Sequence, residues 1–130
     1  MLISDGTPIE ELIEKAKRKK PAQLTPRSLK LMRDRGFTAE VVERRLPHAN
    51  TTLDLWNIVD ILCIRGDGMI IGVQVTSKVN MSSRMNKILD SEHLDTIRAC
   101  NIGIVLHGWS QPHGRLWVCD ERPIVNGARR

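Results

Sequence analysis

The strongest constraint on the fold of this chain is a pair of β-rich runs on either side of the turn Gly66-Asp67-Gly68. The first run is LDLWNIVDILCI (residues 53–64) and the second is MIIGVQVTS (residues 69–77). Two such runs joined by a short glycine-bearing loop predict a β-hairpin. With Asp67 at the tip of the hairpin, Asp60 lies directly opposite Gln74.

Polar side chains interrupt both apolar runs. Gln74, Thr76 and Lys78 follow one another at every second position, so an extended strand points all three to one face. Asp60 and Gln74, being opposed in the hairpin, project to the same face and become neighbours. A carboxylate within an apolar strand is costly to bury unless it is ion-paired, hydrogen-bonded or metal-bound. Asp60 is therefore either paired with an arginine or lysine, or ligates a metal ion in a cleft.

Three helices are predicted before the hairpin. The first, over residues 7–20, ends in a run of cations that are either favourable charges at a helix C-terminus or phosphate contacts: Lys17, Arg18, Lys19 and Lys20. The second begins at the cap Thr25 and ends at Gly36. The third spans residues 38–46. Two short helices joined at a glycine are also compatible with a helix-turn-helix regulator, although such joints are common in proteins that do not bind DNA.

Glu43 falls on the apolar face of the third predicted helix. It comes four residues after Ala39 and three before Leu46, both of which are expected to pack on the sheet. Charged residues ordinarily occupy the opposite face of such a helix. Glu43 is therefore expected either to converge on Asp60 or to sit at the edge of the apolar stripe beside an arginine.

The remainder of the chain completes a mixed α/β fold. Residues 82–100 are predicted to be helical with a break near Ser91, and residues 102–109 and 115–120 are predicted strands. We expect one domain over residues 1–130, with a central sheet flanked by helices. Trp109 and Trp117 are expected in the core, with base stacking as the alternative.

Two further polar residues have less distinctive settings. Asp54 is expected at the surface where the first strand of the hairpin starts, with a role as an outer metal ligand as the alternative. His107, near the end of a strand, is expected to be structural.

Charge and composition restrict the partners. The chain has 130 residues, a formal net charge of +5 and an isoelectric point near 9.5, which permit a polyanionic partner without requiring one. Its three cysteines are widely spaced, which argues against a disulfide framework or a zinc site and suits the reducing cytoplasm. We expect no membrane span, no signal peptide and no organic cofactor.

The stretch GFTAEVVERRL (residues 36–46) followed by VDILCIRGDGMIIGVQVTS (residues 59–77) resembles the PD-(D/E)XK nuclease superfamily, which includes archaeal-type Holliday junction resolvases and VRR-NUC domains. The stretch QVTSKVNMSSRMNKI (residues 74–88) further resembles small phage and bacterial proteins of this fold. The resemblance covers residues 36–120. It implies a restriction-endonuclease-like αβββαβ core, with residues 1–35 as an N-terminal helical extension and 121–130 as a tail.

The resemblance also implies roles for individual residues. Glu43 matches the helix glutamate and Asp60 the metal-binding aspartate of the superfamily. Gln74 stands where the motif has Asp or Glu; its carbonyl oxygen can still ligate Mg²⁺, but without charge, so affinity should be weaker. Thr76 stands where the motif has its lysine. Lys87 on the next helix is the favoured substitute, with Lys78 and Arg84 as further candidates for phosphate contact.

These matches imply a DNA endonuclease that depends on Mg²⁺ or Mn²⁺ and is selective for branched DNA. The metal would be held by Asp60, Gln74, Glu43 and the main-chain carbonyl of Val75, and a homodimer is expected by analogy with the resolvases. The departures at Gln74 and Thr76 keep an alternative open, namely a catalytically inactive nuclease-fold protein that binds DNA or another partner. A helix-turn-helix regulator ranks third, because it leaves Asp60 unexplained.

Overall fold

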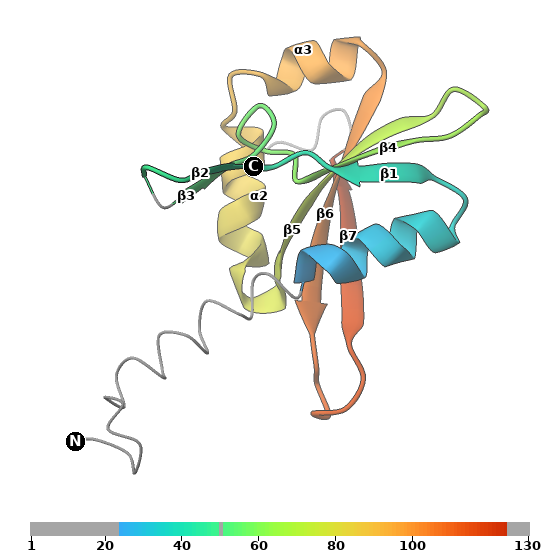
Figure 1. The fold of residues 1–130 in the computed structure, drawn as a ribbon, viewed down its shortest axis with the longest axis vertical. Coiled ribbons are helices and arrows are strands. Elements are labelled where there is room, and N and C mark those ends of the chain that lie inside the picture. The colour runs from blue at the N-terminus through green and yellow to red at the C-terminus, as the bar shows by residue number, and fades with distance from the viewer. Residues whose placement is uncertain (1–23, 50, 125–130) are drawn as a thin grey trace.

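The computed structural model describes residues 24–49 and 51–124, which form a five-stranded mixed sheet flanked by helices (Figure 1). A helix over residues 24–34 precedes the sheet. The other elements are, in chain order, β1 (Thr38–Val41), β2 (Arg44–Leu46), β3 (Thr51–Leu53), β4 (Ile61–Ile64), β5 (Ile70–Ser77), η1 (Lys78–Asn80), α2 (Met81–Leu89), α3 (Leu94–Ala99), β6 (Ile102–Ser110) and β7 (Val118–Ile124). The helix predicted over residues 7–20 and the last residues of the predicted tail lie outside the described residues.

The strand order in the sheet is β1-β4-β5-β6-β7. Neighbouring strands are antiparallel except β5 and β6, which are parallel. A parallel pair needs a crossover connection, and η1, α2 and α3 supply it. The strands β2 and β3 form a separate antiparallel pair. The break predicted near Ser91 is confirmed, because this residue lies between α2 and α3.

The register of β4 and β5 confirms the predicted hairpin. Ile61 pairs with Val73 and Ile64 pairs with Ile70, which is the register of a turn centred on Asp67. The Arg65 N–H donates to the Met69 carbonyl at 3.0 Å and closes the turn. β4 is shorter than the predicted run, because residues 54–60 form a loop and Asp60 directly precedes the strand.

The helix predicted over residues 38–46 is wrong, since this segment forms β1 and β2. β1 lies along β4 from the pair Thr38–Ile64 to the pair Val41–Ile61, so its backbone groups are satisfied by the sheet. Ala39 is buried, and both a helical and a strand pattern would place it on the buried face, so it does not distinguish the two. The β-branched side chains that follow it favour the strand. Without a second helix after Gly36, the helix-turn-helix interpretation loses its basis.

The helix over residues 24–34 starts before its predicted cap, because Leu24 and Thr25 are both already helical. Leu24 is buried against the core, which favours continuing the helix to include it. The predicted end is confirmed: Gly36 has a φ of 91° and its N–H donates to the Arg33 carbonyl. The guanidinium of Arg33 donates to the Ala39 carbonyl at 2.8 Å, which fastens the helix to β1.

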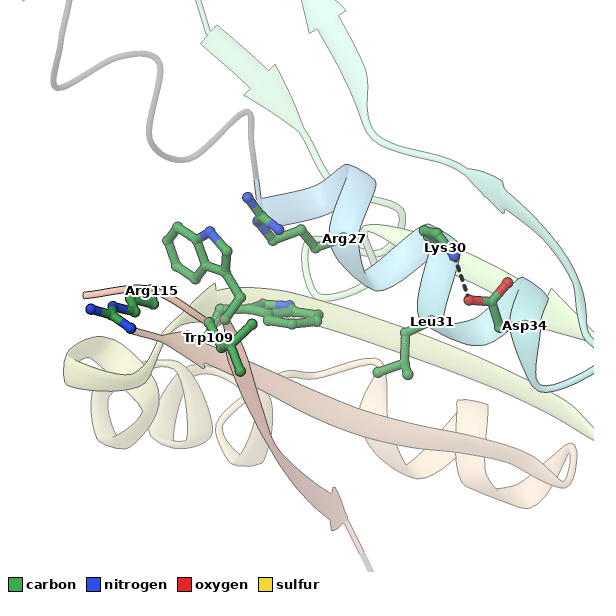
Figure 2. A pocket seen from close by; sticks show the side chains of 8 residues that line it. Arg27, Lys30, Leu31, Asp34, Trp109 and Arg115 are labelled. Atoms are coloured by element: carbon green, nitrogen blue, oxygen red, sulfur yellow. Dashed lines mark hydrogen bonds and ion pairs between the residues drawn. The ribbon is translucent and has the colours of Figure 1, made fainter. Parts of the chain in front are cut away.

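Two apolar layers pack on opposite faces of the sheet. The 24–34 helix covers one face, where Leu24 and Met32 contact a cluster that includes Val73, Val75 and Trp109. The helices α2 and α3 lie on the other face (Figure 2). They pack on it with an apolar cluster of their own. Because side chains alternate along β5, Gln74 projects to the α2 face.

A buried polar link joins the 24–34 helix to β6. The indole N–H of Trp109 donates to Ser28 Oγ at 2.7 Å, and Ser28 Oγ lies 2.8 Å from His107 Nδ1. The other ring nitrogen of His107 is 3.1 Å from Glu121 Oε2. Burial lowers the pKa of His107, so the ring is neutral: the Ser28 hydroxyl donates to Nδ1, and Nε2–H donates to Glu121. Trp109 and His107 are thus buried structural residues, as predicted.

Two further observations concern the C-terminal strand and the length of the helices. β7 continues to Ile124, past the boundary at residue 120 expected for the tail. Within the described residues, every helix is too short or too polar to cross a membrane.

Candidate metal centre

Three carboxylates converge beside the start of β4. One oxygen from each of Glu43, Asp54 and Asp60 lies within 4.8 Å of the others. Asp60 is 4 % exposed, and the other two residues are partly buried. We call these three residues the acidic cluster.

Backbone contacts bring the three segments of the acidic cluster together. Glu43 lies in the link between β1 and β2, and the N–H of its neighbour Val42 donates to the Asp60 carbonyl at 2.8 Å. Asp54 starts the loop that leads into β4. That loop reverses through Trp56 and Asn57, which both have left-handed backbone conformations, and closes with a bridge between Leu55 and Val59. The reversal returns Asp54 to the side of Asp60.

The amide of Gln74 lies between two of the carboxylates. Its Nε2 donates to Asp60 Oδ2 at 2.7 Å and to Asp54 Oδ2 at 3.3 Å. The Val75 N–H donates to the same Asp60 oxygen at 2.7 Å. The predicted contact between Asp60 and Gln74 is therefore confirmed.

The orientation of the Gln74 amide differs from the expected one. The amide presents its NH₂ group to the carboxylates, whereas a metal ligand would present its carbonyl oxygen. That oxygen, Oε1, is buried and has no hydrogen-bond partner among residues 24–49 and 51–124. The physical reason is that carboxylate oxygens accept hydrogen bonds, and the NH₂ group of the amide is the donor that Gln74 can supply to both of them.

Basic residues on α2 approach the acidic cluster. Lys87 Nζ is 3.7 Å from Asp54 Oδ2, and Asp54 has a side chain that is only 13 % exposed. Arg84 precedes Lys87 by three residues, which places both on the same side of the helix. Lys87 thus lies beside the cluster, at the place that the resemblance implies for it.

Lys78 does not reach the acidic cluster. The prediction that it continues the face of Gln74 and Thr76 is wrong, because β5 ends at Ser77 and Lys78 begins η1. Its Nζ lies 3.2 Å from Asp120 on β7, in an exposed ion pair. Thr76 remains on the Gln74 face and is buried.

Burial and mutual repulsion oppose ionisation of the cluster. The pKa of Asp60 is raised from 3.8 to about 8. Burial is the largest cause, and the hydrogen bond and charge of Asp54 add to it, while the Val75 N–H acts in the opposite direction. Burial and the charge of Asp54 also raise the pKa of Glu43. The cluster is therefore short of positive charge, and binding either a proton or a cation would relieve it.

This raised pKa predicts how stability varies with pH. Between about pH 4 and pH 8, Asp60 keeps its proton in the native protein but has lost it in the unfolded chain. The contribution of protonated Asp60 to the free energy of unfolding is therefore fully present below pH 4 and is lost as the pH rises to 8. Asparagine at position 60 cannot ionise. We expect Asp60→Asn to become progressively more stable than the wild-type protein over this interval, by several kcal/mol at its upper end. Urea unfolding of both proteins from pH 4 to pH 9 measures the difference, and a constant difference would contradict the prediction.

Asp54 is the member of the cluster that was expected at the surface. In a continuous strand, six residues would separate Asp54 from Asp60 by about 20 Å, so the sequence pattern placed them apart. The reversal at Trp56 and Asn57 brings them together. Asn57 is the signal that could have predicted it, because asparagine favours turns and tolerates the left-handed conformation, whereas Trp56 gives no such indication.

The structure thus brings together most of the predicted site residues: Glu43, Asp60, Gln74, Val75 and Lys87. It separates Lys78 from them, and the basic run Lys17–Lys20 lies outside the described residues. Searches of protein-family models, curated proteins and solved structures gave no significant match to this chain.

Proposed function

We propose that this protein is a metal-dependent phosphodiesterase that hydrolyses DNA, with the acidic cluster as its metal centre. The observation that carries this proposal is the convergence of three carboxylates at a buried point within ion-pair reach of Lys87. Carboxylate oxygens are the ligands that Mg²⁺ and Mn²⁺ prefer. A divalent cation bound there would polarise a phosphate oxygen and lower the pKa of a bound water.

The residues around the cluster fit such a cation. Asp60 and Asp54 would be its main ligands, with Glu43 beside them. If the Gln74 amide rotates by half a turn, it offers Oε1, which has no partner among the described residues, in place of its NH₂ group. The Val75 carbonyl is a further ligand that the resemblance implies. The raised pKa of Asp60 means that cation binding competes with a proton.

Lys87 and Arg84 are proposed to balance the charge that develops on the phosphate. Preorganised cations at such a point can account for much of the rate enhancement in phosphoryl chemistry. Thr76 cannot carry this charge, and Lys78 is engaged by Asp120. The α2 helix is therefore the source of positive charge in this proposal.

The order of the elements supports a restriction-endonuclease-like core. The 24–34 helix, which was expected in the N-terminal extension, takes the place of the helix expected over residues 38–46. With it, β1, β4, β5, α2 and β6 follow one another as αβββαβ, and the β2–β3 pair is inserted after β1. Glu43 departs from the pattern, because it lies between two strands and not on the helix. DNA as substrate follows from the resemblance and is compatible with the net positive charge. A preference for branched DNA and a homodimer follow from the resemblance alone, and all three are part of the proposal.

A second candidate is a nuclease-fold protein that binds DNA or another partner without cutting. The orientation of Gln74 favours it, because the amide donates to Asp60 and Asp54, whereas a metal ligand would present its carbonyl oxygen. The buried Thr76, which stands at the position of the motif lysine, also favours this candidate because it carries no charge.

A cleavage assay separates the two candidates. Linear duplex, single-stranded and four-way-junction DNA are incubated with the protein in Mg²⁺, in Mn²⁺ and in EDTA. The first candidate predicts cleavage with either metal and none in EDTA, together with a rise in melting temperature on addition of Mn²⁺ because the ion binds the native state. Binding of DNA with neither cleavage nor a melting shift would establish the second candidate in its place.

A further inference from the structure

A hollow of about 590 Å³ opens between the 24–34 helix and the end of the β6–β7 hairpin (Figure 2). The helix lines it with Arg27, Lys30 and Asp34. The hairpin lines it with Trp109, Arg115 and Trp117. Its volume is in the range of pockets that hold small organic ligands.

The lining of the hollow combines aromatic and cationic groups. The guanidinium carbon of Arg27 lies 4.5 Å from the centroid of the Trp117 ring. Arg27 Nε is buried and has no hydrogen-bond partner within residues 24–49 and 51–124. Asp34 is held by Lys30 at 2.7 Å. The carboxylate in the lining is thus neutralised by one cation, and the charges of Arg27 and Arg115 remain in excess.

The hollow is separate from the acidic cluster. Trp109 packs with Val73 and Val75 on the face of the sheet that the 24–34 helix covers. Gln74, which contacts the cluster, projects to the opposite face. A ligand in the hollow therefore needs neither the carboxylates nor a metal.

We propose that this hollow binds an unpaired nucleotide of a single-stranded nucleic acid. The base stacks on the pair formed by Trp117 and Arg27, and a neighbouring phosphate pairs with Arg115. A simple anion would not need the aromatic wall, and a neutral aromatic ligand would not need the excess of cations. Stacking on aromatic and arginine planes together with ionic contacts to the backbone is the usual way in which proteins hold unpaired strands.

Fluorescence anisotropy of a labelled (dT)₁₂ strand, titrated with the full chain in EDTA, tests this proposal. Trp117→Ala is expected to raise the dissociation constant about 10-fold, the effect of one lost stacking contact, and Trp117→Phe should restore most of the affinity. Arg115→Gln should weaken binding and reduce the slope of log affinity against log salt by about 0.7. The matched control is Arg122→Gln, which removes an exposed β7 arginine outside the hollow and should leave affinity unchanged.

Competition distinguishes the sources of the nucleotide. Unlabelled (dT)₁₂ and (rU)₁₂ should both displace the probe, whereas the mononucleotide dTMP and a duplex of equal length should displace it poorly. Displacement by dTMP as effective as by (dT)₁₂ would overturn the assignment to a strand. Equal losses in Arg115→Gln and Arg122→Gln would overturn the site, because they would indicate general attraction to a basic surface.

Arg115 is exposed, so Arg115→Gln tests the nucleotide site even if the loss of Trp117 disturbs folding. Circular dichroism shows whether the Trp117→Ala variant is folded. Because binding is measured without metal and without cleavage, its failure would leave the proposed metal centre unaffected, and failure of cleavage would leave the hollow unaffected.

Discussion

Replacing Asp60 with asparagine is expected to lower the rate of metal-dependent DNA cleavage by on the order of 10³. Asp60 is the most deeply buried of the three carboxylates and lies between Gln74 and the Val75 N–H, so its charge is central to any cation held there. Asparagine has nearly the same shape and keeps an acceptor for the Val75 N–H. Single-turnover cleavage, and melting temperatures with and without Mn²⁺, measure the two effects: cleavage and the metal-induced shift should disappear together.

Asp67→Asn provides a matched control for this substitution. Asp67 lies in the exposed β4–β5 turn, where it accepts hydrogen bonds from Arg65 and from the Met69 N–H. The same chemical change there is expected to leave both cleavage and the metal-induced shift intact. Cleavage that persists in Asp60→Asn would remove the acidic cluster from the mechanism, whatever the control shows.

Replacing Lys87 with methionine is expected to lower cleavage by about 10²-fold to 10³-fold while the metal-induced melting shift is retained. The substitution preserves an unbranched apolar side chain and removes the ammonium group that lies 3.7 Å from Asp54. In the proposed mechanism this group acts on the phosphate and not on the metal. The combination of lost cleavage and retained metal binding is therefore the specific signature, measured by the same two assays as for Asp60.

Lys78→Met is the comparison for Lys87. Its ammonium group pairs with Asp120 in an exposed site, and such pairs contribute little to stability. We expect near-wild-type cleavage from this variant. The opposite pattern, with activity lost in Lys78→Met and kept in Lys87→Met, would contradict the assignment of the catalytic charge to α2.

The contact between Asp60 and Gln74 could be predicted from the sequence because it depends on local rules. The Gly66-Asp67-Gly68 turn determines the register of the hairpin, and a period of two residues determines which side chains share a face. The approach of Lys87 followed instead from the resemblance, because its contact with Asp54 joins α2 to the loop before β4, two elements that are not neighbours in the chain.

The remaining parts of the cluster depend on contacts that no local pattern specifies. Residues 38–46 have a periodicity that fits a helix, but residues 38–41 form a strand because they pair with the edge of β4. Glu43 still arrives beside Asp60, for a different reason: the backbone bond from Val42 to Asp60 places it there. Asp54 was expected at the surface, with an outer metal ligand only as the alternative, because a loop reversal at Trp56 and Asn57 replaces what the sequence indicates as continuous strand.

The parallel pairing of β5 with β6 has a consequence for the kinetics of folding. This pair forms only after the chain has closed a long crossover through α2 and α3, and such non-local closure is slow. Lys87 is carried by that crossover, so its contact with Asp54 is completed only when the crossover docks. A phosphate that pairs with Lys87 needs this finished arrangement, so it would bind after the rate-limiting step. It would therefore prolong the lifetime of the native state by slowing unfolding while leaving the folding rate almost unchanged.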